Sequence, residues 1–261
     1  MSNLALALRD SSTMLRRNLL HARRYPSLTL NLLLTPVMLL LLFVYVFGDA
    51  MSAGIGGGDR SDYIAYIVPG LLLMTIGSTT IGTAVSVAND MTEGIIARFR
   101  TMAIHRGSVL VGHVVGSVVQ SILSVVLVGA VGVAIGFRSA DATALEWLAA
   151  FGLLVLFTLA LTWIAVGMGL VSPNAEAASN NAMPLIFLPL ISSAFVPVDS
   201  MPGWFQPVAE YQPFTPAIET LRGLLLVTGI GHNGWLAVVW SLALTALGYL
   251  WATAKFNNDP K

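Results

Sequence analysis

The chain has 261 residues and a net charge of zero, with 56% hydrophobic and only 10% charged residues. Soluble domains carry about 25% charged residues, so this composition cannot supply the polar surface of a soluble domain. The charge balance gives no reason to expect a nucleic-acid partner, and the absence of cysteine excludes disulfides, thiolate metal sites and a cysteine nucleophile. The composition predicts an all-α integral membrane protein.

Residues 1–26 predict an amphipathic interfacial helix. With successive residues about 100° apart around a helix, Leu4, Leu8, Leu15 and Leu19 share one side and the five arginines of the segment lie opposite. Such a helix would rest in the headgroup layer, with its arginines toward anionic membrane lipids. A solvated basic tail is the alternative.

Six stretches without a charged residue are each long enough to cross the hydrocarbon core, which needs about 20 apolar residues. They predict transmembrane helices over 28–48, 63–88, 107–136, 147–171, 179–198 and 234–254, within a membrane domain of residues 27–255. Pro184, Pro189 and Pro197 interrupt the fifth stretch, which is tolerated where neighbouring helices satisfy the freed carbonyls.

The positions of lysine and arginine predict the orientation of these helices. Ten of the thirteen lie in the N-terminal segment, in the connection between the second and third spans, or at the C-terminus. Only Arg60, Arg138 and Arg222 fall on the other side. Both termini, including the tail of residues 256–261, are therefore expected in the cytoplasm of a multi-pass cell-membrane protein.

A short charged helix is predicted over residues 90–105, between two charge-free stretches. Ile95 and Phe99 lie on its broad apolar face and Glu93 lies opposite. Asp90, with a glutamate three residues later, resembles a capping box at the start of this helix. The apolar face could be buried against the lipid surface or in a groove of another protein, and the residues alone do not decide between them.

The predicted spans contain no acid, lysine or arginine, and His113 is their only histidine. A proton- or sodium-coupled carrier needs a titratable site in the bilayer, so this pattern disfavours an ion-coupled secondary transporter. His113 itself could hydrogen-bond a neighbouring helix or contact a substrate. Lys255 and Lys261 are the only lysines and neither follows a glycine, so the chain has no P-loop and is not expected to be an ATPase.

Residues 199–230 are expected to form short re-entrant helices on the outer side, because their first half is too polar and too rich in proline to span. Thr215 is expected to cap one of them, with Pro216 at its first position. Aromatic residues of this density favour the headgroup level. They could form an outer gate or a plain interfacial anchor, and the candidates are Trp204, Phe205, Tyr211 and Phe214.

Two stretches carry a family resemblance. The pattern Asp90-x-x-x-Gly94-x-x-x-Arg98-Phe99-Arg100 resembles the cytoplasmic loop of type-2 ABC exporter permeases, most closely the daunorubicin-resistance branch. Residues 192–225, SSAFVPVDSMPGWFQPVAEYQPFTPAIETLRGLL, resemble the segment that joins the fifth and sixth spans of that branch. The two occur in the family's order, and the likeness covers essentially the whole chain.

The resemblance implies that residues 90–105 form a coupling helix in a cleft of a separate ATPase subunit. Phe99 and Met102 would be its apolar anchors. The docking residues carried over are Asp90, Glu93, Gly94, Arg98, Phe99, Arg100, Met102 and Arg106. The resemblance also implies two ATPase copies that bind ATP and Mg²⁺, a second permease that is identical or homologous, and no cofactor or metal in this chain.

The function expected from this resemblance is export of amphipathic drug-like or lipid-like molecules by an ATP-driven complex. An ion-coupled carrier and a non-transporting scaffold are the alternatives. Hydroxyl-bearing and aromatic side chains would suit such a cargo, although hydroxyls in membrane helices usually bond a backbone or a neighbouring helix. The candidates for the path are Thr75, Ser78, Thr79, Thr80, His113, Ser192, Ser193 and Phe195.

Overall fold

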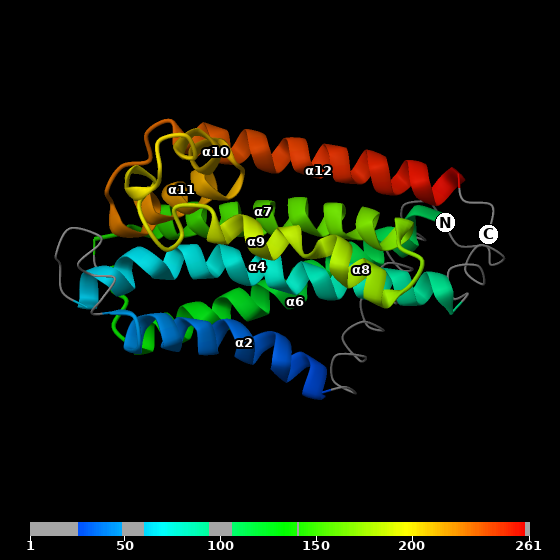
Figure 1. Cartoon of the computed structure of the whole chain (residues 1–261), viewed down its shortest axis with the longest axis horizontal. Coiled ribbons are helices and arrows are strands. Elements are labelled where there is room, and N and C mark those ends of the chain that lie inside the picture. Colours follow the sequence, from blue (N-terminus) through cyan, green and yellow to red (C-terminus); the bar gives the residue numbers. More distant parts are fainter. Residues whose placement is uncertain (1–25, 49–59, 94–105, 140, 259–261) are drawn as a thin grey trace.

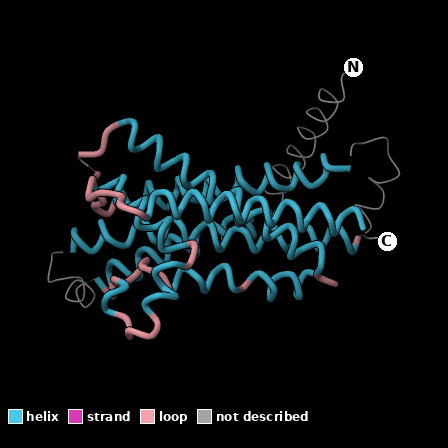
Figure 2. The backbone as a smooth tube through the Cα atoms, turned by 90° about the horizontal axis from the view of Figure 1, so that it is seen from above, coloured by secondary structure: helices cyan, strands magenta, loops and turns pink. Residues whose placement is uncertain are grey.

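The computed structural model describes residues 26–48, 60–93, 106–139 and 141–258, and within these ranges it is helical with no β-strand (Figure 2). The predicted interfacial helix of residues 1–26 lies outside the described residues, apart from Pro26. The elements are α2 (Pro26–Tyr45), α4 (Arg60–Thr92), α6 (Arg106–Ala134), α7 (Ala144–Val171), α8 (Ala175–Ala182), α9 (Pro184–Leu190), the 3₁₀ turn η2 (Val198–Ser200), α10 (Gln206–Tyr211), α11 (Phe214–Leu226) and α12 (Asn233–Asn258).

Helices α4, α7 and α12 run in one direction and α2 and α6 in the opposite direction (Figure 1). The bundle therefore has two ends. At the α8 end, α4 and α7 finish and α6 begins. At the α11 end, α6 finishes, α7 and α12 begin, and η2, α10 and α11 gather.

Within the described residues, four helices are long and apolar enough to cross a membrane: α4, α6, α7 and α12. They overlap the ranges predicted for the second, third, fourth and sixth spans. The described apolar part of α2, Leu34–Tyr45, is shorter. Large apolar side chains such as Leu123, Leu242 and Leu250 are exposed on the outer faces of α6 and α12, as expected for contact with lipid.

The stretch predicted as the fifth span, residues 179–198, is not one helix. Helix α8 ends at Ala182 and α9 begins at Pro184, with Met183 between them. Pro184 has no backbone N–H to donate to the preceding turn, so the helical hydrogen-bond pattern is interrupted at this point although Met183 keeps a helical conformation. After α9, the chain passes close to α4: a Cβ at Gly70 would lie 2.7 Å from the Cα of Ala194.

Helix α11 packs against α4, α7 and α12 and buries Ile218, Leu221 and Leu225 along one side. The predicted cap by Thr215 is wrong, because α11 already begins at Phe214 and has no side-chain cap. The Thr215 hydroxyl instead donates to the carbonyl of Ala209, which closes the turn between α10 and α11.

The core has two parts. The larger cluster joins α2, α4, α6, α7, α9 and α11 and includes the fully buried Tyr63, Phe157 and Leu221. The smaller cluster lies toward the α8 end, where Val87 and Trp163 meet residues of α6 and α12. The bundle also buries polar side chains at each of its two ends, and these are the starting point for the functional site.

Candidate functional site

The first polar group lies at the α8 end, where α4 approaches the start of α6. Asp90 is only 8% exposed, and its Oδ2 lies 2.9 Å from Nε2 of His113 on α6. Val87, Leu110 and Trp163 belong to the apolar cluster that packs around this part of the bundle. A buried carboxylate is stabilised only by such a partner, so the pair joins the end of α4 to the first turns of α6.

This placement changes the predicted role of Asp90. Helix α4 continues through Thr92, so Asp90 lies inside a helix and cannot begin a new one as the capping-box interpretation required. Glu93 is exposed just after α4, and its N–H donates to the Asn89 carbonyl at 2.9 Å. The docking candidates Gly94, Arg98, Phe99, Arg100 and Met102 lie outside the described residues, and Arg106 is the first residue of α6.

His113 makes the kind of interhelical contact that was one of its two predicted roles. Its partner in this contact, Asp90, had been predicted to lie on the surface that docks the ATPase subunit. The spans were also expected to contain no acid or base besides His113, whereas the structure buries Asp90 at the end of α4 and Arg222 on α11. Asp90 lies two residues beyond a predicted span and Arg222 lies in the segment predicted as re-entrant, and sequence ranges alone could not show that both fold inward.

The predicted path hydroxyls of α4 are bonded within the bundle. Thr75 donates to the Leu71 carbonyl at 2.7 Å, Ser78 to that of Thr75 at 2.9 Å, and Thr80 to that of Gly77 at 2.7 Å. Thr79 bonds Ser121 of α6 at 2.7 Å. Thr75, Thr79 and Thr80 are also buried, so their local role in this structure is helix packing.

The candidates after α9 are buried as well. The Ser192 hydroxyl donates to the Pro189 carbonyl at 2.5 Å, and the N–H of Ser193 donates to Thr215 Oγ1 at 3.3 Å. The ring of Phe195 stacks on Phe43 of α2, with centroids 4.5 Å apart. Ser193 and Phe195 therefore hold the irregular segment against α11 and α2, and Ser192 closes the turn after α9.

Sequence reasoning missed a second polar site, at the α11 end. Arg222 is 7% exposed, and its Nη2 donates to the carbonyls of Tyr66 and Ser193, both at 3.0 Å. Its guanidinium lies 3.8 Å from the centroid of the Tyr66 ring, and Nη1 pairs with Glu219 at 2.5 Å. Tyr66 in turn donates its hydroxyl to Ser193 at 2.9 Å. One arginine therefore connects α11, α4 and the segment after α9.

The predicted gate aromatics divide into two groups. Trp204 is 81% exposed, Tyr211 is also exposed, and Phe205 packs edge-on against Trp204 at 5.4 Å. Phe214 is fully buried and meets Phe157 of α7 edge-on at 5.0 Å. Phe214 therefore fills the core beneath α11 in this structure, unlike the exposed Trp204.

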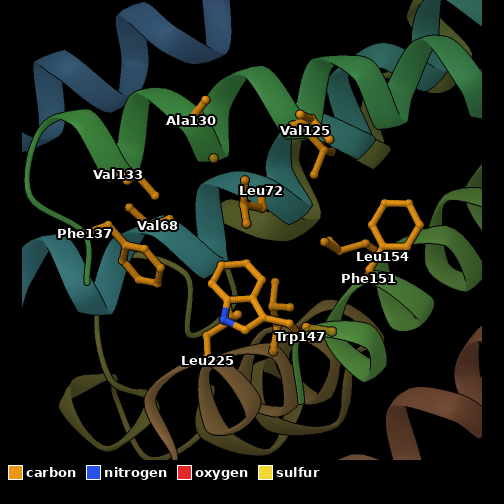
Figure 3. A pocket seen from close by; sticks show the side chains of 14 residues that line it. Val68, Leu72, Val125, Ala130, Val133, Phe137, Trp147, Phe151, Leu154 and Leu225 are labelled. Carbon is orange, nitrogen blue, oxygen red and sulfur yellow. The ribbon is translucent and has the colours of Figure 1, made fainter. Parts of the chain in front are cut away.

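A third feature is an apolar pocket of about 330 Å³ between α4, α6, α7 and α11 (Figure 3). Val68 and Leu72 line it from α4, Val133 from α6, Trp147 from α7 and Leu225 from α11. None of the path candidates lines this pocket. Among the described residues, no group of three or more histidines and acids could hold a metal ion.

Comparison with known proteins places these features in a family. Residues 10–226 match the family model described as "ABC-2 type transporter". The chain is 28% identical over 225 residues to the daunorubicin resistance ABC transporter permease protein DrrB1 of Streptomyces coeruleorubidus, covering 85% of this chain and 76% of that protein.

Two further relatives are more distant. A probable doxorubicin resistance ABC transporter permease protein DrrC of Mycobacterium tuberculosis is 26% identical over 196 residues, 70% of this chain and 68% of its own length. Nodulation protein J of Rhizobium meliloti is 23% identical over 213 residues, 74% of each chain. Because the family model spans well over half of the sequence, this chain belongs to the ABC-2 type transporter family, as a membrane-spanning permease.

Proposed function

We propose that this chain is the transmembrane subunit of an ATP-driven exporter that moves amphipathic drug-like or lipid-like molecules out of the cell. The observation that carries the proposal is the family match over residues 10–226. The names of two relatives, which refer to daunorubicin and doxorubicin resistance, support a bulky amphipathic cargo. An ion-coupled carrier does not account for this family membership.

The energy would come from a separate ATPase subunit that binds ATP and Mg²⁺. It would dock on the connection between α4 and α6, with Phe99 and Met102 as apolar anchors. The Asp90–His113 pair supports this role indirectly, because it ties together the two helices from which the connection emerges. Closure of the ATPase could then move both helices as a unit.

The proposed arrangement has six spans, with both termini and the α8 end in the cytoplasm. The distribution of lysine and arginine supports this orientation, with ten of thirteen on that side. Helices α8 and α9 would together form the fifth membrane segment. Two permeases, identical or homologous, would enclose the path above two ATPase subunits.

Affinity purification from detergent-solubilised native membranes tests the docking surface. Phe99→Asp would place a charge in a dry groove and should weaken ATPase binding about 30-fold or more, as for loss of an interface hot spot. Phe205→Asp is the matched control, because it makes the same change at a partly exposed aromatic residue at the α11 end. Membrane insertion of both variants should equal that of the unchanged chain.

The proposal predicts that an ATPase with a P-loop co-purifies with the unchanged chain and with Phe205→Asp, but not with Phe99→Asp. Equal recovery with Phe99→Asp would show that the connection is not the docking surface. If no ATPase co-purified with any of the three chains, the subunit assignment itself would fail, and a scaffold role would become the better account.

A further inference from the structure

The apolar pocket has almost no polar chemistry of its own. Fourteen residues line it, and all have hydrocarbon side chains or none, except for the indole N–H of Trp147 (Figure 3). A bound water needs two to four polar partners, and a buried polar group without a partner is costly. Neither water nor a molecule rich in hydroxyl and amino groups is stabilised there, whereas a hydrocarbon chain is.

The pocket opens sideways, between α6 and α7. Val126, Val133 and Phe151 are lining residues that are also exposed on the outer faces of these helices. Because both helices are long and apolar enough to cross the membrane, the opening faces the region that lipid chains occupy. Gly129 and Ala150 create the space behind this opening, since neither fills it with a long side chain.

The α11 end of the pocket has a cationic group beside it. Arg138 is exposed just beyond α6, and its Nη1 donates to the carbonyls of Val133 and Phe137 at 2.8 and 3.0 Å. Both of these residues line the pocket, as does Trp147 at the start of α7. Tryptophan is enriched at the level of lipid headgroups, and a guanidinium matches the geometry of a phosphate. The hydrocarbon-lined space therefore ends beside an exposed guanidinium group.

We propose that the pocket is a phospholipid site, in which one acyl chain enters between α6 and α7 and the lipid phosphate lies against Arg138. A cavity of about 150 Å³ holds benzene, so about twice that volume accommodates a run of methylenes rather than a whole lipid. The remainder of the lipid stays in the bilayer. Under the proposed orientation this is a lipid of the outer leaflet, and it is distinct from the transported cargo.

The site can be tested on the full chain without cargo or ATPase. The chain is purified in mild detergent, stripped of lipid, titrated with dioleoyl phosphatidylglycerol and examined by native mass spectrometry. Gly129→Leu fills the pocket, because a Cβ there would lie 3.8 Å from Leu72 Cδ2 without a clash. Gly152→Leu is the matched control, a glycine of α7 whose Cβ would meet nothing within 4 Å.

The expected result is one tightly bound phospholipid on the unchanged chain and on Gly152→Leu, with about tenfold weaker binding to Gly129→Leu, as for the loss of about two buried methylenes. Equal binding to both glycine variants would overturn the proposal. Displacement of the phospholipid by an exported compound would also overturn it and would assign the pocket to the cargo. Since no ATPase is present, either outcome is independent of the docking experiment.

A second variant tests the phosphate contact without changing the pocket. Arg138→Gln should weaken phosphatidylglycerol binding about threefold, the scale of an exposed ion pair, and leave binding of dioleoylglycerol unchanged. The diacylglycerol probe has the same chains and no phosphate. If both probes lost affinity equally, Arg138 would be supporting the pocket structure, and the proposed phosphate contact would be wrong.

Discussion

Buried charged side chains hold both ends of the bundle, but they join different numbers of segments. At the α8 end, Asp90 and His113 link two helices, α4 and α6, through a side-chain pair at 2.9 Å. At the α11 end, Arg222 links α11 to α4 and to the segment after α9, and it also stacks on the Tyr66 ring. A buried charged side chain therefore joins two helices at the α8 end and three segments at the α11 end. We call the contacts of Arg222 the three-segment link.

The difference lies in which groups lose a partner when each link opens. Separation of Arg222 would leave its buried guanidinium without the Tyr66 and Ser193 carbonyls that accept from it, and an unpaired buried charge is costly. Separation of Asp90 from His113 would break a single side-chain pair between two helices. The α11 end is therefore joined at more points than the α8 end, and separating its segments should cost more free energy.

The largest effect is expected from breaking the three-segment link. Arg222→Met should lower the free energy of unfolding by about 3 kcal/mol, because it removes the bonds to the Tyr66 and Ser193 carbonyls and the pair with Glu219. The measurement is an unfolding titration with sodium dodecyl sulfate in mixed micelles. Arg138→Met, which removes two hydrogen bonds made by an exposed arginine at the same end, should cost no more than about 1 kcal/mol. A similar small change for Arg222→Met would remove the distinction between the ends.

A smaller loss is expected at the α8 end. Asp90→Ala leaves His113 buried without this partner and should destabilise the chain by about 2 kcal/mol in the same titration. Glu93→Ala, an exposed acid three residues later, should leave stability unchanged. The double variant Asp90→Ala with His113→Ala should lose about 1 kcal/mol less than the sum of the single variants. Strictly additive losses would mean that the pair does not join α4 to α6.

The smallest effect is expected between the two ends. Thr79→Val removes a hydroxyl that bonds Ser121 across α4 and α6, and it should cost about 0.6 kcal/mol, the average for such bonds in membranes. Thr80→Val is the control, because that hydroxyl bonds the carbonyl of Gly77 within its own helix. If Thr80→Val cost as much as Thr79→Val, the interhelical bond would contribute nothing measurable to holding the bundle together.

Much of the helical framework could be predicted, because length and apolarity are local properties of the sequence. The uninterrupted runs predicted the positions of α4, α6, α7 and α12, and the prolines at 184 and 189 indicated that the fifth stretch was irregular. The family followed from two quoted stretches, and the match over residues 10–226 confirms it.

The polar links could not be predicted from the same patterns. An aspartate followed by a glutamate three residues later is typical of a helix start, but Asp90 and Glu93 stand at a helix end, because burial of Asp90 against His113 favours continuation of α4. The count of arginines on each side of the membrane treats Arg222 as a loop residue, although it is a buried residue of α11. The pocket depends on small residues of separate helices meeting in space, so no single stretch of sequence contains it.

Helix α4 carries one partner of each charged link, and its 33 residues make it about 50 Å long. Along this length it has no side chain at Gly70 and Gly77, where the backbone of Ala194 and of Leu185 rests directly on it. Backbones in such close contact cannot slide past each other without a clash. A tilt imposed on α4 at the α8 end would thus displace the α9 segment by the same rigid-body motion.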